Sequence, residues 1–279
     1  MDLLDKRNIL EETCPKHGTK LWEMKYPNRD TGTVETSIFC PTCTADDIAL
    51  TEKELLQEAT NRQSYISTYD VLLRESIVPN ELRGATFDNF KAESTEERQM
   101  LAFVKQQAEK YLAGMTGNTL ITGQTGIGKS HLCFALAKHL NEAFKEQGNP
   151  KSILFVSLTE IIKQIKQGWN FGKNAVLTEF EAVKLLSGVD YLILDDLGAK
   201  NATINPKSDW EQDFLFDILN NRETTIFNTN LSSAELKTVY NARNASRILK
   251  GLDGNSFKAF SITDKRYIIN KLKQGEQTK

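Results

Sequence analysis

Eight residues have the types and spacing of a phosphate-binding loop: Gly123-Gln-Thr-Gly126-Ile-Gly128-Lys129-Ser130. Glycines let the backbone turn successive N–H groups toward a phosphate, and the dipole of a following helix adds to the attraction. Lys129 would reach the β- and γ-phosphates of ATP, and the Ser130 hydroxyl would ligate Mg²⁺. The expected nucleotide-binding residues are therefore Gly123, Gln124, Thr125, Gly126, Ile127, Gly128, Lys129, Ser130 and His131.

Two adjacent carboxylates, Asp195 and Asp196, follow the apolar run Tyr191-Leu-Ile-Leu194. A buried strand would deliver both acids at its carboxyl end, which is the edge where open α/β sheets bind ligands. We expect Asp195 to hold Mg²⁺, directly or through water, and Asp196 to orient or deprotonate the attacking water. The alternative is an acidic turn in solvent. Together with the loop, the pair predicts an ATPase.

Asn230 is a third polar position, at the end of the strand-like run 224–229. We expect that run to lie between the acid-bearing strand and the phosphate loop, so Asn230 would sense the γ-phosphate or position water. An asparagine that ends a strand is also a common turn former.

A different chemistry is indicated by Cys14, His17, Cys40 and Cys43, which form two pairs with two-residue gaps. Three of the four cysteines and one of the three histidines lie in this cluster. Three thiolates and one imidazole suit a closed, tetrahedral and structural Zn²⁺ site. Free thiols or redox chemistry are the alternative. Because the segment is poor in large aliphatic residues, it needs such a staple in order to fold.

The composition sets limits on these interpretations. A length of 279 residues allows one α/β core with a small appended module. The net charge of −2 excludes strong global attraction to nucleic acid, so any DNA contact must come from a local basic patch. There is no run of about 18 apolar residues and no secretory signal pattern. We therefore expect a cytoplasmic protein with no membrane contact.

Short apolar runs alternate with helical patterns beyond residue 84, which predicts a parallel sheet covered by helices on both faces. The expected strands are 118–122, 152–157, 191–194 and 224–229, and the expected helices are 44–73, 95–112 and 131–143. The fold class is α/β, a P-loop domain with a small N-terminal zinc-binding module. The expected domains are a zinc module with a helical partner-binding arm (1–62), a linker (63–83) and the ATPase domain (84–279).

Four stretches resemble a known family: Gly84-Ala-Thr-Phe87-Asp-Asn-Phe90, Gly128-Lys-Ser-His-Leu132, Leu194-Asp-Asp-Leu-Gly198 and Asn228-Thr-Asn-Leu231. They are similar to motifs of the DnaC/DnaI-type replicative helicase loaders, AAA+ ATPases related to the transposon-associated IstB proteins. The likeness runs from about residue 82 to the C-terminus, and the zinc module resembles the DnaI-like branch. The resemblance implies an AAA+ fold, ATP-dependent self-association, single-stranded DNA binding and delivery of a DnaB-type hexameric helicase during replication initiation.

The same resemblance implies roles for several basic residues. Ser246-Arg247-Ile248 looks like the segment whose arginine reaches the γ-phosphate of a neighbouring subunit, with Arg243 as the second candidate and Arg266 as a later arginine near the nucleotide. The stretch 163–173, which contains Lys163, Lys166 and Trp169, lies where the family places single-strand contacts, although its lysines also fit the wet face of a helix.

Two alternatives to the loader function stay open. The first is an IstB-like transposition ATPase that acts on duplex DNA, and the second is a nucleotide-gated, non-catalytic helicase adaptor or inhibitor. Asp196 stands where many AAA+ enzymes carry glutamate, and an aspartate reaches one methylene less far. We therefore expect slow hydrolysis that is stimulated by a partner or by DNA.

Overall fold

The computed structural model describes residues 7–28, 32–169, 177–198, 208–259 and 261–262. The chain divides into two compact units, Met1–Gln63 and Ser64–Lys279. Arg266 and residues 170–173 of the expected DNA-contact stretch lie outside the described residues. Within the described part of the chain, no helix combines the length and apolarity that crossing a membrane would need.

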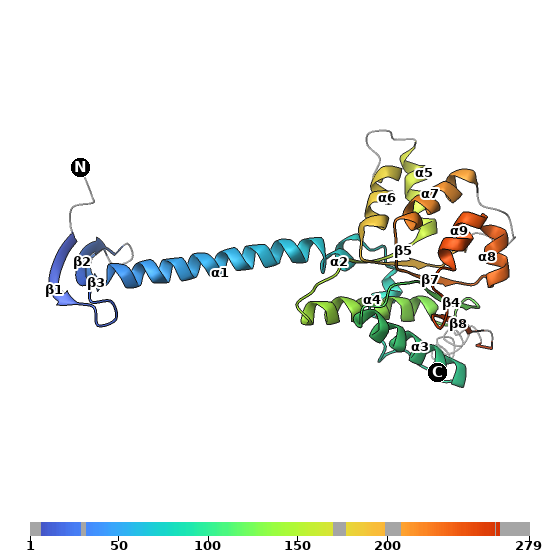
Figure 1. The fold of residues 1–279 in the computed structure, drawn as a ribbon, viewed down its shortest axis with the longest axis horizontal. Helices are drawn as coiled ribbons and strands as arrows, with labels where there is room; N and C mark the ends of the chain where they lie inside the picture. Colours follow the sequence, from blue (N-terminus) through green and yellow to red (C-terminus); the bar gives the residue numbers. More distant parts are fainter. Residues whose placement is uncertain (1–6, 29–31, 170–176, 199–207, 260, 263–279) are drawn as a thin grey trace, which may run out of the picture. The chain divides into compact units, whose positions relative to one another are not determined.

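The first unit is a three-stranded antiparallel sheet followed by a helix (Figure 1). The strands β1 (Arg7–Thr13), β2 (Lys20–Pro27) and β3 (Val34–Phe39) lie in chain order, and α1 (Pro41–Ser67) starts directly after β3 and ends in the second unit. Trp22 pairs with Ile9 on one side and Phe39 on the other. Only Cys14 and Cys40 are buried among the described residues of this unit, so it has no apolar core of its own.

The second unit is built around a five-stranded parallel sheet with the order β5-β6-β7-β4-β8. Its strands are β4 (Thr119–Gly123), β5 (Ile153–Ser157), β6 (Tyr191–Asp195), β7 (Thr225–Thr229) and β8 (Ser256–Ala259). The first four confirm the predicted strands to within one residue at each end. The sequence did not predict β8, a short strand at the edge of the sheet.

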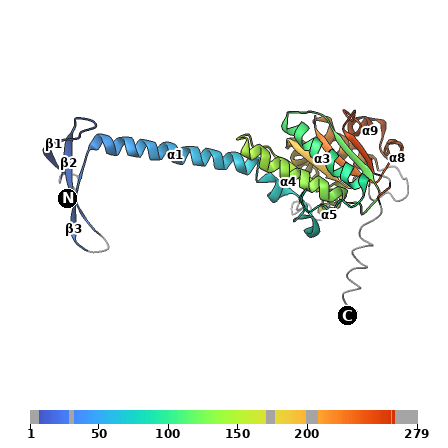
Figure 2. The same cartoon turned by 90° about the horizontal axis from the view of Figure 1, so that it is seen from below.

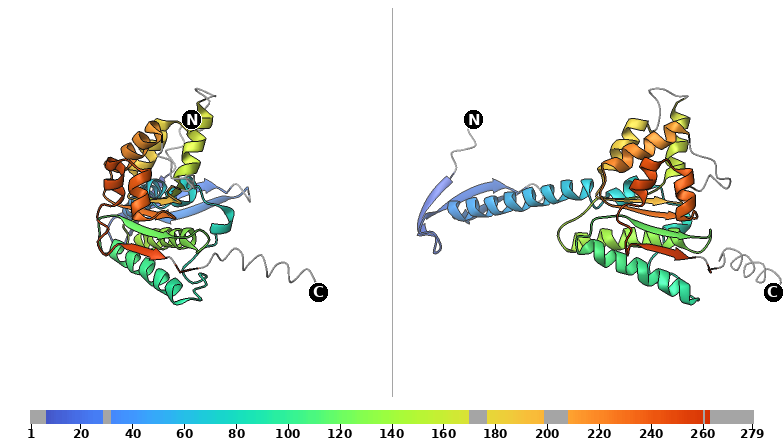
Figure 3. Two further views of the ribbon diagram at one scale, coloured as in Figure 1. Left: turned by 90° about the vertical axis from the view of Figure 1, so that its right-hand side faces the viewer. Right: turned by 45° about the vertical axis from the view of Figure 1, so that its right-hand side comes forward.

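Helices cover both faces of this sheet (Figures 2 and 3). One face packs against α3 (Thr95–Leu112) and α4 (Lys129–Glu146). The other packs against α5 (Leu158–Gly168), α6 (Glu179–Gly188), α7 (Asp209–Asn220), α8 (Ser233–Val239) and α9 (Ala242–Ile248). Successive strand residues face opposite layers, as with Leu192 in one core and Ile193 in the other. The predicted two-sided α/β architecture is confirmed.

Local signals explain where the helices begin. α3 starts at a capping box in which the Ser94 hydroxyl accepts from the Glu97 N–H and the Glu97 carboxylate accepts from the Ser94 N–H. Thr178 and Ser232 cap α6 and α8 in the same way. These boxes satisfy backbone donors that have no partner inside the helix.

The segment between α1 and α3 contains α2 (Val71–Glu75) and the 3₁₀-helix η1 (Asn80–Leu82). Val71 and Leu72 are buried in the cores of the second unit. After α2, Ile77 donates its N–H to the Phe155 carbonyl, and the Ser76 hydroxyl accepts from the Phe155 N–H. This stretch thereby covers the open edge of β5, which would otherwise expose backbone groups.

Candidate active site and metal centre

The stretch from the end of β4 to the start of α4 needs glycine at three points, Gly123, Gly126 and Gly128. Gly128, the residue before α4, has φ 93°. A Cβ there would lie 2.6 Å from Cε2 of Phe90, and a Cβ on Gly123 would lie 2.4 Å from the Ala259 carbonyl oxygen. The loop therefore keeps its backbone open in front of the N-terminus of an 18-residue helix, as a phosphate site requires.

Lys129 lies at the start of α4 and is buried. Its Nζ donates to the carbonyl oxygens of Gly123 and Gln124, both at 2.8 Å. The ammonium group is thus held against the loop itself, at the position from which a lysine reaches phosphate oxygens.

The segment at residues 84–90, which opens the expected ATPase domain, packs on this loop. His131 Nε2 lies 2.9 Å from the Thr86 carbonyl oxygen, and its ring centroid lies 5.5 Å from that of Phe90. His131 and His139 are both on α4, as expected, and His139 contacts the Phe87 ring. Cys133, also on α4, is fully buried.

Asp195 ends β6 and is buried. Burial raises the pKa of its carboxyl group, while hydrogen bonds from Asn228 and Ser130 act in the opposite direction. The Ser130 hydroxyl is near enough to this carboxyl group to lower its pKa, so the phosphate loop and the first acid lie together. A hydroxyl and a carboxylate side by side at this edge form a hard-oxygen donor set that fits Mg²⁺.

Asp196 follows with φ 55°, and it is the one non-glycine position with positive φ in the described chain. Its N–H donates to Oδ1 of Asn228 at 2.7 Å, and Nδ2 of Asn228 donates to Asp195. Asn230, by contrast, lies exposed just beyond the end of β7. The sequence interpretation missed Asn228, although a polar residue inside a strand as apolar as Ile226-Phe227 was a usable signal.

The two candidate trans-acting arginines lie one turn apart on α9, over the same ring. The guanidinium carbons of Arg243 and Arg247 are 4.5 and 5.5 Å from the Phe216 ring centroid. Arg243 pairs with Asp213 at 2.9 Å, and Arg247 donates to Asn220 Oδ1.

The backbone around Arg247 is anchored at the amino end of β4. Asn118, which precedes that strand, donates to the Arg247 carbonyl oxygen at 2.7 Å. The phosphate loop follows the carboxyl end of the same strand, about 16 Å away at the usual rise per residue. The backbone of Arg247 therefore lies at the amino ends of the strands, whereas the phosphate loop of the same chain lies at their carboxyl ends.

Aromatic side chains gather where α5 and α7 meet. The ring centroids of Trp169 and Trp210 are 5.0 Å apart, Trp210 stacks on Phe214, and Trp169 is 58% exposed. Lys166 pairs with Glu211 at 2.8 Å and Lys163 with Glu160 at 3.5 Å. The buried Ile161, Ile162 and Ile165 form the core side of α5, so the two lysines lie on its solvent side.

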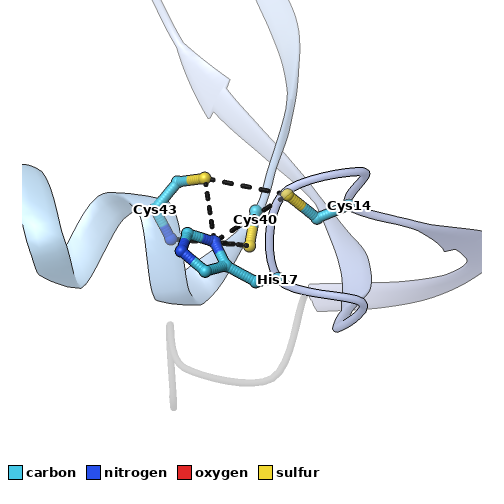
Figure 4. A group of neighbouring side chains, drawn as sticks. All are labelled: Cys14, His17, Cys40 and Cys43. Atoms are coloured by element: carbon cyan, nitrogen blue, oxygen red, sulfur yellow. Dashed lines mark hydrogen bonds between the residues drawn. The ribbon is translucent and has the colours of Figure 1, made fainter.

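In the first unit, the four predicted metal ligands converge (Figure 4). Cys14 and His17 come from the turn after β1, Cys40 follows β3, and Cys43 lies in the first turn of α1. The His17 Nδ1 atom lies 3.9, 3.7 and 3.3 Å from the sulfur atoms of Cys14, Cys40 and Cys43, and the Cys14 and Cys43 sulfur atoms are 3.7 Å apart.

These spacings fit a single tetrahedral ion. With Zn–S of about 2.3 Å and Zn–N of about 2.0 Å, the sulfur atoms of one site lie about 3.8 Å apart and each lies about 3.5 Å from the nitrogen. The distances of 3.3 to 3.9 Å given above lie close to the edges of such a tetrahedron, and all four ligand atoms lie within 4.8 Å of one another. The cluster could hold a metal ion without rearrangement.

Neighbouring groups support the ligands. His17 Nε2 lies 3.2 Å from Asp46 Oδ2, which leaves Nδ1 to face the cysteines. The Thr19 hydroxyl lies 3.1 Å from the Cys40 sulfur, and the Cys43 N–H donates to it at 3.4 Å. The hydrogen bond with Thr19 is the main cause that lowers the pKa of the Cys40 thiol to about 5. Such bonds favour the thiolate, the form that binds metals.

The fold and the loop define a P-loop ATPase of the AAA+ class. The family model described as IstB-like ATP binding protein matches residues 47–253, which is most of the chain, and the chain belongs to this family. The match includes the phosphate loop and both carboxylates and begins after the last of the four metal-ligand candidates. No curated protein matches the sequence at a significant level.

Several solved structures are similar to this chain. A crystal structure of the DnaC helicase loader has 20% sequence identity and a TM-score of 0.49, over 65% of this chain and 99% of that one. A putative primosome component from Streptococcus pyogenes serotype M3 has 21% identity and a TM-score of 0.46, over 67% and 91%. AMPPCP-bound DnaA from Aquifex aeolicus has 22% identity and a TM-score of 0.48, over 70% and 56%.

Proposed function

We propose that this chain is an ATP-dependent loader that binds a hexameric DnaB-type helicase and single-stranded DNA and deposits the helicase during replication initiation. The observation that carries the proposal is the pairing of an IstB-like ATPase with a separate N-terminal unit whose Cys/His cluster lies outside the family match. The resemblance of the sequence to DnaI-like loaders implies the same combination of an ATPase domain and an N-terminal zinc module.

In the ATPase site, Lys129 would exchange the loop carbonyls of Gly123 and Gln124 for phosphate oxygens. The Ser130 hydroxyl and the Asp195 carboxylate would hold Mg²⁺, which neutralises phosphate charge when bound. Asp196 would accept a proton from the attacking water, or orient it, and Asn230 would lie near the γ-phosphate. Because aspartate is short, hydrolysis is slow until a partner or DNA adjusts the site.

Self-association through ATP would complete that site. From the amino ends of the strands, Arg247 cannot reach the nucleotide of its own chain. It would therefore supply its charge to the nucleotide of a neighbouring copy. An arginine that acts in trans stabilises charge in the transition state of phosphoryl transfer. ATP binding and assembly are coupled in this arrangement.

The exposed Trp169 beside Trp210 supports a contact with single-stranded DNA. Base stacking on such rings is tolerant of sequence, which suits a loader. Because the nearby lysines are paired with acids, we assign the binding energy to stacking more than to charge.

The N-terminal unit would bind the helicase. Zinc held by Cys14, His17, Cys40 and Cys43 would do no chemistry, since four protein ligands leave no position for a substrate. Its role would be to fold a unit that has almost no buried residues and so to build the surface that the partner recognises.

Titration of the purified full-length chain with a DnaB-type hexamer, with and without ATP, tests the proposal. We expect a complex that the Asp196→Asn variant retains, because this change blocks hydrolysis and leaves binding intact. Cys14→Ser, which removes one metal ligand, should abolish the complex while ATP binding persists. Absence of any complex with the wild-type chain would refute the loader function.

The family match favours a second candidate, an IstB-like transposition ATPase. Tighter binding to duplex than to single-stranded DNA, with no helicase contact, would select it. Tight ATP binding with no phosphate release in the presence of DNA and helicase would instead indicate a non-catalytic adaptor or inhibitor of the helicase.

A further inference from the structure

The helix α1 carries large apolar side chains that the described part of the chain leaves uncovered. Four of them, on one side of the helix, are between 39% and 72% exposed: Ile48, Leu55, Leu56 and Ile66. With 3.6 residues per turn, these four lie within about 100° of one another around the helix axis. Exposed apolar residues that share a face mark a surface that a partner covers.

This face follows the spacing of a two-stranded coiled coil. Alternating steps of four and three residues give six positions within α1, which we call the seam: Ile48, Glu52, Leu55, Ala59, Arg62 and Ile66. All six residues are exposed. Four are apolar, and the two charged ones have opposite signs. Because charges in such a seam are costly unless they are paired, their positions indicate which partner fits.

The seam is symmetrical about the middle of the helix. Glu52 and Arg62 lie equally far before and after position 57, and so do Leu55 and Ala59 and the two isoleucines that end the seam. A second copy of the helix, running antiparallel with a two-fold axis at position 57, faces each glutamate with an arginine and each apolar side chain with another apolar one. The seam is therefore complementary to itself.

We propose that α1 pairs with the α1 of a second copy of this chain as an antiparallel coiled coil centred on position 57. Glu52 of each chain faces Arg62 of the other, and Leu55 faces Ala59. Each pairing occurs twice, because the same surface is used by both copies. A leucine opposite an alanine fills the space between the helices without crowding them.

The same two charges disfavour a parallel pair. In register, a parallel copy would put Glu52 against Glu52 and Arg62 against Arg62, so that like charges would meet twice in the seam. Polar residues at seam positions are known to set the register of a coiled coil at some cost in stability. Here the opposite charges select the antiparallel orientation and fix its centre.

The pairing is separate from the ATP-dependent self-association described above, since it uses no residue of the nucleotide site. The experiment therefore measures the dimer dissociation constant of the full-length, zinc-loaded chain by sedimentation without nucleotide. Glu52→Arg fills the seam with arginines alone, and Arg62→Glu fills it with glutamates alone. Each reversal turns two attractive pairs into two repulsive ones, so the dissociation constant should rise about 10-fold or more.

An equal mixture of these two variants should regain the wild-type affinity as a heterodimer, because every seam arginine then faces a glutamate of the other chain. This rescue also shows that both variants are folded. Glu54→Arg makes the same charge change two residues further on, about 160° around the helix, and should leave the dissociation constant unchanged.

Two leucines test the apolar part of the seam. Leu55 and Leu50 are 59% and 57% exposed, but they lie about 140° apart around the helix. Leu55→Ala should raise the dissociation constant about 10-fold or more, because the leucine is lost twice in each dimer, whereas Leu50→Ala should not change it.

A wild-type chain that stays monomeric without nucleotide would overturn the inference and leave the ATPase and loader proposals intact. So would a mixture of the reversed variants that does not regain affinity, since the contact would then be parallel or on another face. A monomeric wild type whose complex with a DnaB-type hexamer is weakened by Leu55→Ala, and not by Leu50→Ala, would assign the seam to the helicase instead.

Discussion

Replacing Asp46 with alanine should weaken zinc binding by the N-terminal unit without removing any ligand. Asp46 Oδ2 lies 3.2 Å from His17 Nε2, on the far side of the imidazole from the cysteines. A carboxylate there fixes the tautomer that presents Nδ1 to the metal and holds the orientation of the ring. The substitution tests the site through a residue that never contacts the ion.

The magnitude follows from exposure. Loss of such a partner costs about 10- to 100-fold in metal affinity, or about 1.4 to 2.7 kcal/mol. The Asp46 side chain is 53% exposed, so solvent screens its interaction and the lower end applies. We therefore expect about a 10-fold loss. Since structural zinc sites bind with about 10–16 kcal/mol, the variant should still fold when zinc is in excess.

Competition for zinc with chelators of graded affinity measures the effect, with metal content read by mass spectrometry and folding of the chain by circular dichroism. Asp47→Ala is the matched control, because it removes the same charge from the neighbouring residue, which has no side-chain contact with His17. Equal zinc affinity of the two variants would refute the assignment of Asp46. A protein that binds no zinc would refute the metal site itself.

Three further outcomes test the second unit. Lys129→Ala should abolish ATP binding in a fluorescence titration, because Lys129 Nζ lies against the carbonyl oxygens of the phosphate loop. Lys138→Ala on the same helix is the control and should leave ATP binding unchanged. Arg247→Ala should keep ATP binding but lose about 10³-fold or more of the turnover of the assembled protein. Mixing it with Lys129→Ala chains should restore turnover, and no restoration would contradict action in trans. Trp169→Ala should weaken single-stranded DNA binding by about 1–3 kcal/mol, whereas Phe180→Ala, which removes a still more exposed aromatic side chain on α6, should leave it unchanged.

Some features of the site were available from spacing alone. The glycines of the phosphate loop, the helix α3 and the strands β4, β5, β6 and β7 are local patterns, so they were located to within a residue or two. The Cys14/His17 and Cys40/Cys43 pairs are also local, and their convergence needed only the chemistry of one shared ion. The strands β1, β2 and β3 were missed: none of their side chains is buried, and only β3 alternates regularly between exposed and half-buried positions.

What the sequence by itself determined was therefore which residues carry the chemistry: a loop for phosphate, two acids after a buried strand and four ligands for a metal. Only the tertiary structure decided how they meet. β7 lies between β4 and β6, as the sequence predicted, but only the structure shows that Asn228 donates to Asp195 while Asn230 is exposed. It also shows that the Arg247 backbone lies at the amino ends of the strands, away from the phosphate loop of its own chain. The physical reason is that contacts between side chains of neighbouring strands depend on register and packing across the whole sheet, which no local pattern encodes.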